Sequence, residues 1–256
     1  MCQGKEMSTN KVTVVIGDVH GCIQEFDSIL NIIEKMTCDK RIIVVGDLMD
    51  RGPEPVACVH RTRELGLECI LGNHEDKHVR WRDQLNKSNT SAIQNPVKPM
   101  ARLDRLAHES LSDSDITWMK SLKLNLQIHN KLWAVHGGCE PRRAFDNQRR
   151  NQMLRVRYVD TDGLSVKLNP DKTQPANTKH WAEYWRGPES IVYGHCVHDL
   201  SQPKLNKFSN GYCLGIDTGC CFGGNLTAAI FVDDKLDSTI SVPAKKKYYI
   251  RYALDD

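Results

Sequence analysis

Three short apolar runs in the first third of the chain share one kind of ending, and this ending constrains the fold most. Each run is followed by glycine and then by an acidic or amide residue, and the first two runs consist almost entirely of β-branched residues. The runs and their endings are Val12–Ile16 before Gly17-Asp18, Ile42–Val45 before Gly46-Asp47, and Leu67–Leu71 before Gly72-Asn73. Runs of this kind are typical of strands that are buried on both faces.

Helical patterns separate these predicted strands. Apolar residues recur at helical spacing from Ile23 to Met36, between the first strand and the second. Pro53 and Pro55 suit the start of a further helix over Val56–Leu65. Because strands and helices alternate, we expect an α/β protein with a parallel sheet and right-handed crossovers.

Later segments extend the pattern. We expect the polar stretch from Lys77 to Leu122 to be mainly helical, with a loop or mobile lid at Asn86–Pro99. Asp162-Gly163 predicts a hairpin turn inside the loop-rich stretch Arg142–Lys179. The other predicted strands are Lys131–Val135 before His136, Ser190–Tyr193 before Gly194-His195, Tyr212–Ile216, and Leu226–Val232.

The length and composition of the chain favour a single domain. For 256 residues, of which 40% are hydrophobic, we expect a single domain over 1–256, with a core at about 11–235 and polar tails. The ten cysteines include no C-x-x-C pair, and the first residues lack the apolar segment of a signal peptide. No run is apolar enough to span a membrane. We therefore expect a cytoplasmic protein with free thiols and no membrane association.

Candidate metal ligands follow the predicted strands. In open α/β sheets, ligands bind just beyond the carboxyl ends of the strands, so the loops at several strand ends would meet in one cleft. The candidates are Asp18, His20, Asp47, Asn73, His136 and His195. Two carboxylates, three imidazoles and one amide oxygen suit Mn, Fe or Zn better than an all-oxygen Mg or Ca site. The set suffices for two ions about 3.5–4 Å apart, which would share a carboxylate, deprotonate a water and hold the phosphoryl oxygens.

Each ending taken alone has an ordinary structural interpretation. Gly-Asp after a strand is common turn chemistry, a single histidine is more often a loop residue, and Asn73 alone suits a turn. The repetition of such endings at five predicted strand ends is what indicates a metal site.

Five motifs carry these residues. They are GDVHG at Gly17–Gly21, GDLMDRG at Gly46–Gly52, GNHE at Gly72–Glu75, HGG at His136–Gly138 and GH at Gly194–His195. Together they resemble the signature of the calcineurin-like metallophosphoesterases, and they are most similar to the phosphoprotein phosphatase superfamily. The resemblance implies a metal-dependent phosphoesterase with a four-layer α/β sandwich, in which two mixed β-sheets are flanked by helices.

The resemblance also implies a role for each motif residue. The implied metal ligands are Asp18 and His20 for the first ion, Asp47 as the bridge, and Asn73, His136 and His195 for the second ion. Arg51 would hold the substrate phosphate, and His74 would protonate the leaving group while Asp50 orients it. The chemistry is suitable, since a guanidinium makes bidentate contacts with phosphate and a histidine can act as a general acid.

Within this family, three segments of the chain resemble the ApaH-like phosphatases in particular. They are Asn151–Gly163, Trp181–His195 and Leu214–Ala228. That group includes symmetrical bis(5′-nucleosyl)-tetraphosphatases, which split diadenosine tetraphosphate into two ADP. R-V-R-Y in the first segment resembles the R-M-R-[FY] of ApaH-like enzymes, which implies phosphate contacts for Arg155 and Arg157. Arg186 is a further candidate, and a solvated charged surface is the alternative for these arginines.

Two departures leave the substrate open. Asp50-Arg51-Gly52 is the form found in protein Ser/Thr phosphatases, whereas many ApaH-like sequences have asparagine at the position of Asp50. The loop CEPRRAFDNQ after HGG also differs from the expected forms. The alternatives to a dinucleoside polyphosphate are a phosphoprotein and a capped RNA, which contains the same kind of anhydride bond. A non-catalytic binding module is a third class, and the complete ligand set argues against it.

We therefore expect two divalent ions, with Mn as the first choice and Fe, Zn or Mg as alternatives. The expected partner is a small nucleotide polyphosphate, without an obligate protein partner. No phosphate-cradling C-x₅-R loop is present, so we assign the cysteines near the motifs to packing. Trp181, Tyr184 and Trp185 could stack on a base or pack in the core, and Lys245-Lys246-Lys247 is expected to be solvated surface.

Overall fold

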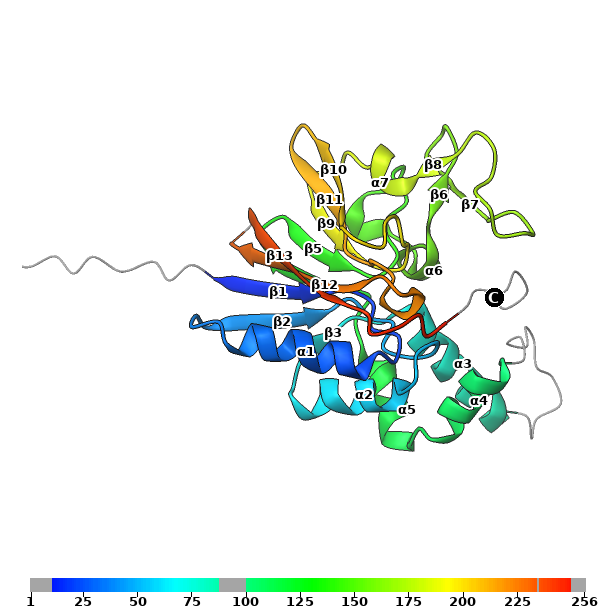
Figure 1. The fold of residues 1–256 in the computed structure, drawn as a ribbon. Helices are drawn as coiled ribbons and strands as arrows, with labels where there is room; N and C mark the ends of the chain where they lie inside the picture. Colours follow the sequence, from blue (N-terminus) through cyan, green and yellow to red (C-terminus); the bar gives the residue numbers. More distant parts are fainter. Residues whose placement is uncertain (1–10, 88–99, 234, 250–256) are drawn as a thin grey trace, which may run out of the picture.

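The structure, a computed structural model, describes residues 11–87, 100–233 and 235–249 (Figure 1). Most of this part of the chain is built around two five-stranded sheets. The order in the first sheet is β13 (Lys235–Pro243), β12 (Asn225–Val232), β1 (Val12–Ile16), β2 (Lys40–Val44) and β3 (Glu68–Cys69). The order in the second is β10 (Lys204–Phe208), β11 (Gly211–Gly215), β9 (Ser190–Tyr193), β5 (Leu132–Val135) and β4 (Asn125–His129).

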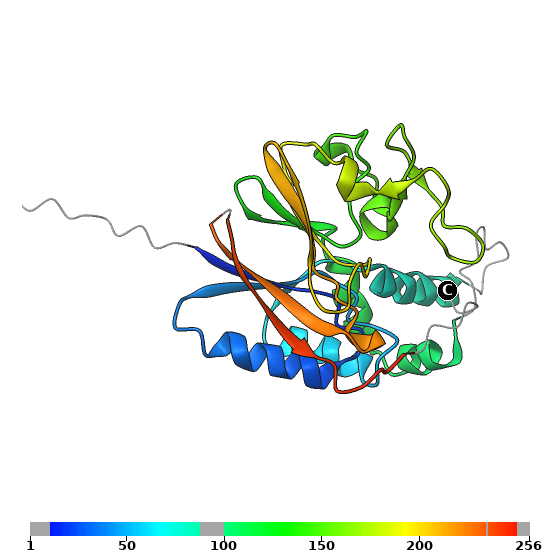
Figure 2. The ribbon, with the colours of Figure 1, turned by 45° about the horizontal axis from the view of Figure 1, so that its top comes forward.

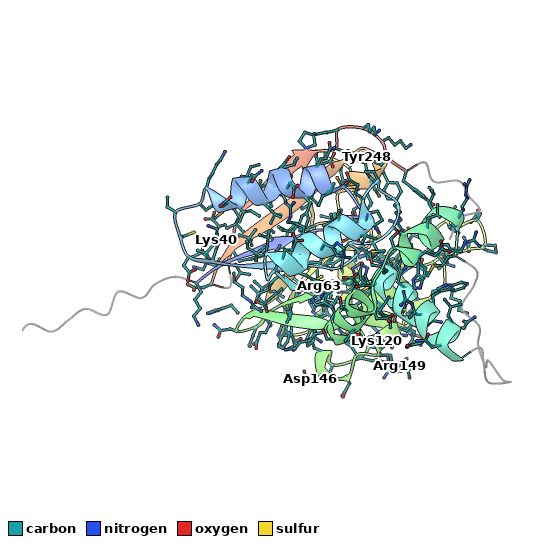
Figure 3. All side chains as sticks on the ribbon, turned by 90° about the horizontal axis from the view of Figure 1, so that it is seen from below. Lys40, Arg63, Lys120, Asp146, Arg149 and Tyr248 are labelled. Carbon is teal, nitrogen blue, oxygen red and sulfur yellow. The ribbon has the colours of Figure 1, made fainter. Side chains whose placement is uncertain are left out.

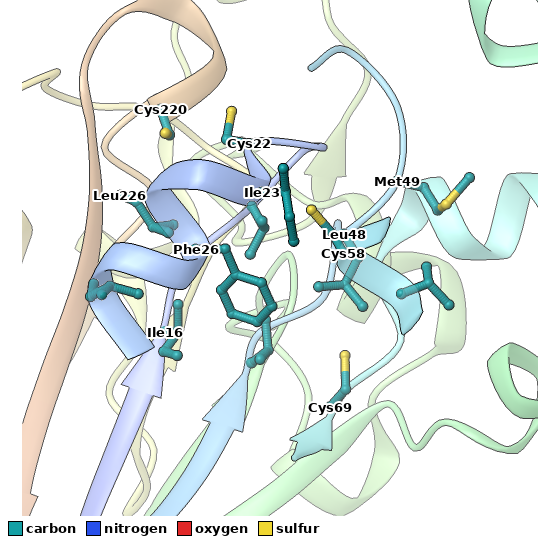
Figure 4. Packing of buried hydrophobic residues seen from close by; sticks show 14 of the residues in the cluster. Ile16, Cys22, Ile23, Phe26, Leu48, Met49, Cys58, Cys69, Cys220 and Leu226 are labelled. Atoms are coloured by element: carbon teal, nitrogen blue, oxygen red, sulfur yellow. The ribbon is translucent and has the colours of Figure 1, made fainter. Parts of the chain in front are cut away.

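The first sheet confirms the predicted alternation of strands and helices. Its strands β1, β2 and β3 are parallel, and α1 (Ile23–Glu34) and α2 (Pro55–Glu64) form the crossovers between them. The sheet is mixed because β12 pairs with β1 in the antiparallel sense. The fully buried Phe26 of α1 packs over the first strands of this sheet (Figure 4). Burial of such a side chain contributes roughly 1.5–3 kcal/mol.

The second sheet packs against the first and is covered on its other side. Val15 and Ile43 of the first sheet share one buried cluster with Val192 and Leu214 of the second. The outer face of the second sheet packs on the segment that contains α6 (Arg150–Arg155) and α7 (Trp181–Tyr184). Figure 2 shows this segment on one side of the two sheets and helices α1 and α2 on the other. The arrangement confirms the expected sandwich of two mixed sheets flanked by helices.

The stretch predicted to be helical contains three helices. They are α3 (Asn73–Lys87), α4 (Arg102–Glu109) and α5 (Asp113–Ser121). The start of α5 is stabilised by a capping box, in which Ser112 accepts from the N–H of Asp115 while the Asp115 carboxylate accepts from the N–H of Ser112. Of the predicted loop or lid at Asn86–Pro99, the first two residues are helical and the rest lies outside the described residues.

The predicted hairpin is present, with β6 (Tyr158–Val159) antiparallel to β7 (Ser165–Val166). A short strand, β8 (Lys179–His180), pairs with the other side of β6 and completes a three-stranded sheet. Gly163 has a φ of 75°, a left-handed conformation that favours glycine in the turn.

Besides β8, three strands were not predicted, and all three lie at the edges of the two large sheets. They are β4, β10 and β13. The expected core boundary at about residue 235 falls short, because β13 pairs with β12 as far as Pro243. Edge strands have one solvent-facing side and therefore lack the continuous apolar run that marks a central strand.

Candidate metal centre and cleft

Loops from both large sheets meet at the carboxyl ends of their parallel strands. The backbone N–H of His20, after β1, donates to the carbonyl of Asp47, after β2, at 2.8 Å. The backbone N–H of His195, after β9, donates to the Asp18 carboxylate with N–O distances of 2.9 and 3.1 Å. The N–H of Gly194 donates to the carbonyl of His136, after β5, at 2.9 Å. These bonds hold the strand ends of both sheets in one group.

The backbone is strained where the motif residues lie. In the described part of the chain, five of the eight non-glycine residues with positive φ belong to the motifs: His20, Asp47, Asp50, Arg51 and His195. Each such conformation costs about 1–3 kcal/mol and persists only when the surrounding structure imposes it. The concentration of strain at one place is typical of a functional site.

Two glycines leave room for the central carboxylates. A Cβ atom at Gly194 would lie 1.9 Å from Oδ1 of Asp18, and one at Gly72 would lie 2.3 Å from Oδ1 of Asp47. Any side chain at either position would displace the carboxylate. The glycines of the GNHE and GH motifs are therefore required by close packing around these two aspartates.

Asp47 lies between two groups of candidate ligands. Its Oδ2 atom is 3.4 Å from Nε2 of His20, and its Oδ1 atom is 3.3 Å from Nε2 of His136. Asp47 forms one potential metal-binding group with His20 and His74, and a second with His136 and His195. Although burial acts the other way, His136 and His74 hold the pKa of Asp47 well below its usual range. Asp47 is thus the one residue shared by these two groups of the described chain.

The histidine tautomers leave ligand nitrogens turned toward the site. Nδ1 of His20 donates to the carbonyl of Met49 at 2.9 Å, and Nδ1 of His136 donates to the carbonyl of Val45 at 2.8 Å. In a neutral imidazole the other nitrogen, Nε2, then carries the lone pair. Backbone acceptors that orient histidines in this way are typical of metal sites.

Several acceptor atoms converge without enough donors between them. Nε2 of His136 lies 3.0 Å from Oδ1 of Asn73, although both atoms are acceptors in the neutral tautomer. Nε2 of His195 is buried and has no hydrogen-bond partner in the described part of the chain. Buried acceptors in contact are unfavourable unless a positive charge lies among them. A bound cation would satisfy all of them, so the residues present fit a metal.

Buried carboxylates near the site also fit a bound metal ion. Burial, with the Asp217 and Asp47 carboxylates nearby, raises the pKa of Asp18 well above its usual range. Burial also raises the pKa of Asp217, which is 5% exposed. Our ligand set omitted Asp217, although it follows strand β11 directly after Gly215-Ile216 and so repeats the strand-end pattern.

Glu75 is a second residue that the sequence analysis left without a role. Its carboxylate accepts from the backbone N–H groups of Asp47 at 2.8 Å, Met49 at 3.0 Å and Gly72 at 3.1 Å. Glu75 is fully buried and belongs to the GNHE motif. It therefore connects the loop after β2 to the loop after β3 and holds the backbone of Asp47 in place.

His74 and Asp50 form the pair that the resemblance implies. Nδ1 of His74 donates to Oδ2 of Asp50 at 2.5 Å, and Oδ1 of Asp50 accepts from Nε2 of His78 at 2.8 Å. Lys77 adds an ion pair with Asp50, with an N–O distance of 2.6 Å. Burial opposes ionisation, but the hydrogen bonds from His74 and His78 hold the pKa of Asp50 well below its usual range. The Asp50 carboxylate thus contacts His74, Lys77 and His78 at the same time.

A cleft of about 1790 Å³ opens above this site, and Asp50, Arg51, Asn73, His74 and His195 line it. Nine of its lining residues are cationic and three are acidic. The cationic residues are Arg51, Lys77, Arg80, Arg102, Arg155, Arg157, Lys172, Lys246 and Lys247. Such an excess of positive charge in a concave surface attracts anions.

The three arginines that were predicted to contact phosphate differ in their surroundings. Arg155 lines the cleft but is paired with Asp76, at an N–O distance of 2.6 Å. Arg157 also lines the cleft, and within the described residues it makes no ion pair. Arg186 does not line the cleft, and its guanidinium donates to the carbonyl of Trp185. The structure therefore brings two of the three arginines to the site.

Two of the aromatic residues considered for base stacking are core residues. Trp181 is fully buried, and its indole N–H donates to the carbonyl of Gly137 at 3.0 Å. Trp185 is 1% exposed and donates to the carbonyl of Glu189 at 2.9 Å. The cysteines near the motifs are free and buried, as expected. None of the described helices has both the length and the apolarity that a membrane crossing requires.

Known proteins resemble the chain over nearly its whole length. The family model for calcineurin-like phosphoesterases matches residues 12–240. The asymmetrical bis(5′-nucleosyl)-tetraphosphatase PrpE of Geobacillus sp. (strain WCH70) is 30% identical over 250 residues, which cover 91% of this chain and 95% of that protein. A symmetrical bis(5′-nucleosyl)-tetraphosphatase of Photorhabdus laumondii is 26% identical over 288 residues, which cover 92% and 99%.

Solved structures share the fold. A provisionally assigned diadenosine tetraphosphatase has a TM-score of 0.69 and 24% identity, and the match covers 93% of this chain and 95% of that chain. A protein serine/threonine phosphatase from Saccharomyces cerevisiae has a TM-score of 0.56 and 14% identity, with coverages of 96% and 82%. The match of the family model over most of the chain shows that the protein belongs to the calcineurin-like phosphoesterase family and is a hydrolase of that kind.

Proposed function

We propose that the chain is a two-metal phosphohydrolase that cleaves dinucleoside polyphosphates, such as diadenosine tetraphosphate, to ADP. The cationic cleft is the observation that carries this proposal. Its volume of about 1790 Å³ exceeds the roughly 300–1,000 Å³ of common small-ligand pockets, and cationic residues outnumber acidic ones by nine to three along its walls. A polyphosphate carries charge on every phosphate, so it can use more of these cations than a single phosphoester can.

The named activities of the relatives support the same substrate class. Both curated relatives are named for the hydrolysis of bis(5′-nucleosyl) tetraphosphates, one as asymmetrical and one as symmetrical. The two names differ in the position of the cut. A symmetrical cut of diadenosine tetraphosphate leaves ADP alone, whereas an asymmetrical cut leaves two different nucleotides.

In the proposed site, six residues hold the metals: Asp18, His20, Asp47, Asn73, His136 and His195. Two divalent ions bound there would supply Lewis-acid activation of water and of the phosphoryl group.

The other residues act on the substrate directly. Arg51 lines the cleft, its Nη1 donates to Nε2 of His20 at 2.8 Å, and its guanidinium can contact a phosphoryl oxygen there. Arg157 lies in the same cleft and would contact a neighbouring phosphate. His74, held by Asp50, would give a proton to the leaving oxygen.

Protein serine/threonine phosphatase activity is the second candidate, and the His74–Asp50 pair favours it. An alkoxide is a poor leaving group and needs a proton from a well-positioned acid. A terminal phosphate ionises with a pKa of about 6 and needs that proton far less. The short hydrogen bond from His74 to Asp50 would therefore be most useful for a phosphoserine or phosphothreonine.

A substrate panel with added Mn²⁺ tests the proposal. We would compare diadenosine tetraphosphate, capped RNA, a phosphothreonine peptide and p-nitrophenyl phosphate, and separate the products by chromatography. We expect the tetraphosphate to have the highest kcat/KM, with ADP as its product, and EDTA to abolish turnover. AMP with ATP as products would assign the asymmetrical cut. A higher kcat/KM for the phosphopeptide or the capped RNA would refute the proposed substrate class.

A further inference from the structure

The chain after β13 reaches the substrate cleft instead of ending as solvated surface. Lys246, Lys247, Tyr248 and Tyr249 line the cleft together with Arg51. In Figures 1 and 2, β13 leads to this segment along the side of the sheets that carries α1, whereas the segment with Arg155 and Arg157 lies on the other side. The cleft thus has a second cationic wall, which comes from the far end of the sequence.

Main-chain bonds fix this wall in place. The N–H groups of Tyr248 and Tyr249 both donate to the carbonyl of Cys221, at 3.0 and 2.9 Å. The buried carboxylate of Glu25, in α1, accepts from the N–H of Lys245 and from the hydroxyl of Tyr248, each at 2.8 Å. Figure 3 shows Tyr248 beside α1. The lysine side chains take no part in these bonds, so they can be changed without removing the anchors.

An aromatic pair connects the wall to Arg51. The guanidinium carbon of Arg51 lies 5.3 Å from the centre of the Phe222 ring, and that ring meets Tyr249 edge to face at a centroid distance of 5.9 Å. Phe222 is thus in contact with both the proposed phosphate-binding arginine and the C-terminal segment. A substrate held at Arg51 would extend along this aromatic surface toward the two lysines.

No acidic side chain within residues 11–87, 100–233 and 235–249 neutralises the charges of the two lysines. Among the described residues, neither Lys246 nor Lys247 forms an ion pair, and the ammonium of Lys246 lies over the ring of Tyr248 at 5.6 Å. Lysines placed beside a cleft that already carries an excess of cations repel those cations unless an anion is bound. Their position suits an extended polyanion better than a single phosphate.

We propose that Lys246 and Lys247 form a subsite for the distal phosphates of an extended nucleotide polyphosphate, on the wall opposite Arg155 and Arg157. The inference rests on the proposed function and specifies how that substrate lies in the cleft. A bound tetraphosphate would have its cleaved bond near Arg51 and the remaining phosphates distributed between the two walls. Affinity would therefore increase with the number of phosphates.

The test replaces both lysines with alanine and uses a series of diadenosine polyphosphates with three, four and five phosphates. We expect KM to rise about 3- to 30-fold for the longer members, because two exposed charge contacts are lost, and to rise least for the triphosphate. Turnover of p-nitrophenyl phosphate and kcat for the tetraphosphate should stay near wild type. A variant with arginine at both positions should retain the wild-type KM.

Lys245→Ala is the matched control. This neighbouring lysine is exposed, does not line the cleft, and contributes only its backbone N–H to the Glu25 anchor. An unchanged KM across the series in the double variant, or an equal rise in Lys245→Ala, would overturn the subsite while leaving the proposed function intact. Failure of the wild type to cleave any member of the series would overturn the proposed function and the subsite with it.

Discussion

Replacement of His74 by asparagine should separate the two candidate functions by their leaving groups. Nδ1 of His74 is held by Asp50 at 2.5 Å, and its Nε2 lies 3.9 Å from the Asp47 carboxylate at the centre of the site. The ring is therefore oriented with its second nitrogen toward the reacting region. Asparagine keeps the backbone N–H that bonds to Asp47 and removes the titratable nitrogen.

The expected magnitude follows from the role of a general acid. Such a group contributes about 10²–10⁴ in rate, or roughly 2.7–5.5 kcal/mol of transition-state stabilisation. An alkoxide leaving group needs this full contribution. A nucleoside diphosphate leaves without it, so we expect less than about a tenfold loss for diadenosine tetraphosphate but a loss of about 10²–10⁴ for a phosphothreonine peptide.

The assay compares kcat for both substrates at saturating Mn²⁺, in the wild type and in His74→Asn. Metal content and thermal unfolding of the variant should match the wild type, which would show that the site remains assembled. Equal losses on the two substrates would refute the reasoning, because the histidine would then act on both reactions alike, for example by holding the nucleophile or the phosphate.

Three further changes test other parts of the site. Asp47→Asn should remove both metals and all turnover, and elemental analysis that finds one tightly bound metal with appreciable activity would show that Asp47 is not a bridge. Arg157→Ala should lower kcat/KM for the tetraphosphate roughly 10- to 100-fold, whereas Arg186→Ala, outside the cleft, should leave it unchanged; equal effects would contradict the assignment. Glu75→Gln leaves at least one of three buried N–H donors facing an amide NH₂, so we expect a loss of roughly 2–4 kcal/mol in the free energy of unfolding. The matching decrease in Tm is about 5–15 °C by calorimetry, and an unchanged Tm would mean that these bonds do not hold the loops.

Much of the candidate site could be predicted from local sequence because its residues follow central strands. The predicted bounds of Val12–Ile16 and Ser190–Tyr193 match β1 and β9. A strand buried on both faces needs a continuous apolar run, which is visible without any knowledge of its neighbours. The residues just after these runs were therefore identified, and the structure brings them together at the carboxyl ends of the strands.

Other features could not be predicted from local sequence, because they depend on contacts between segments that are distant along the chain. Strand β13 is polar at many positions and becomes a strand because β12 offers it hydrogen-bonding groups along one edge. Glu75 belongs to the GNHE motif, but its role appears only when the N–H groups of Asp47 and Met49 in the loop after β2, and of Gly72 after β3, converge on its carboxylate.

The fold class, the family resemblance and the set of candidate metal ligands could all be predicted from the amino-acid sequence. Each depends on a residue and its near neighbours along the chain. Which cations face the cleft, in contrast, depends on the three-dimensional packing of the chain. It brought Arg157 to the cleft and left Arg186 outside, and it placed Lys246 and Lys247 along the same cleft. The physical reason is that the position of a charged side chain in space depends on how segments far apart in the sequence pack against each other, and no local pattern encodes that packing.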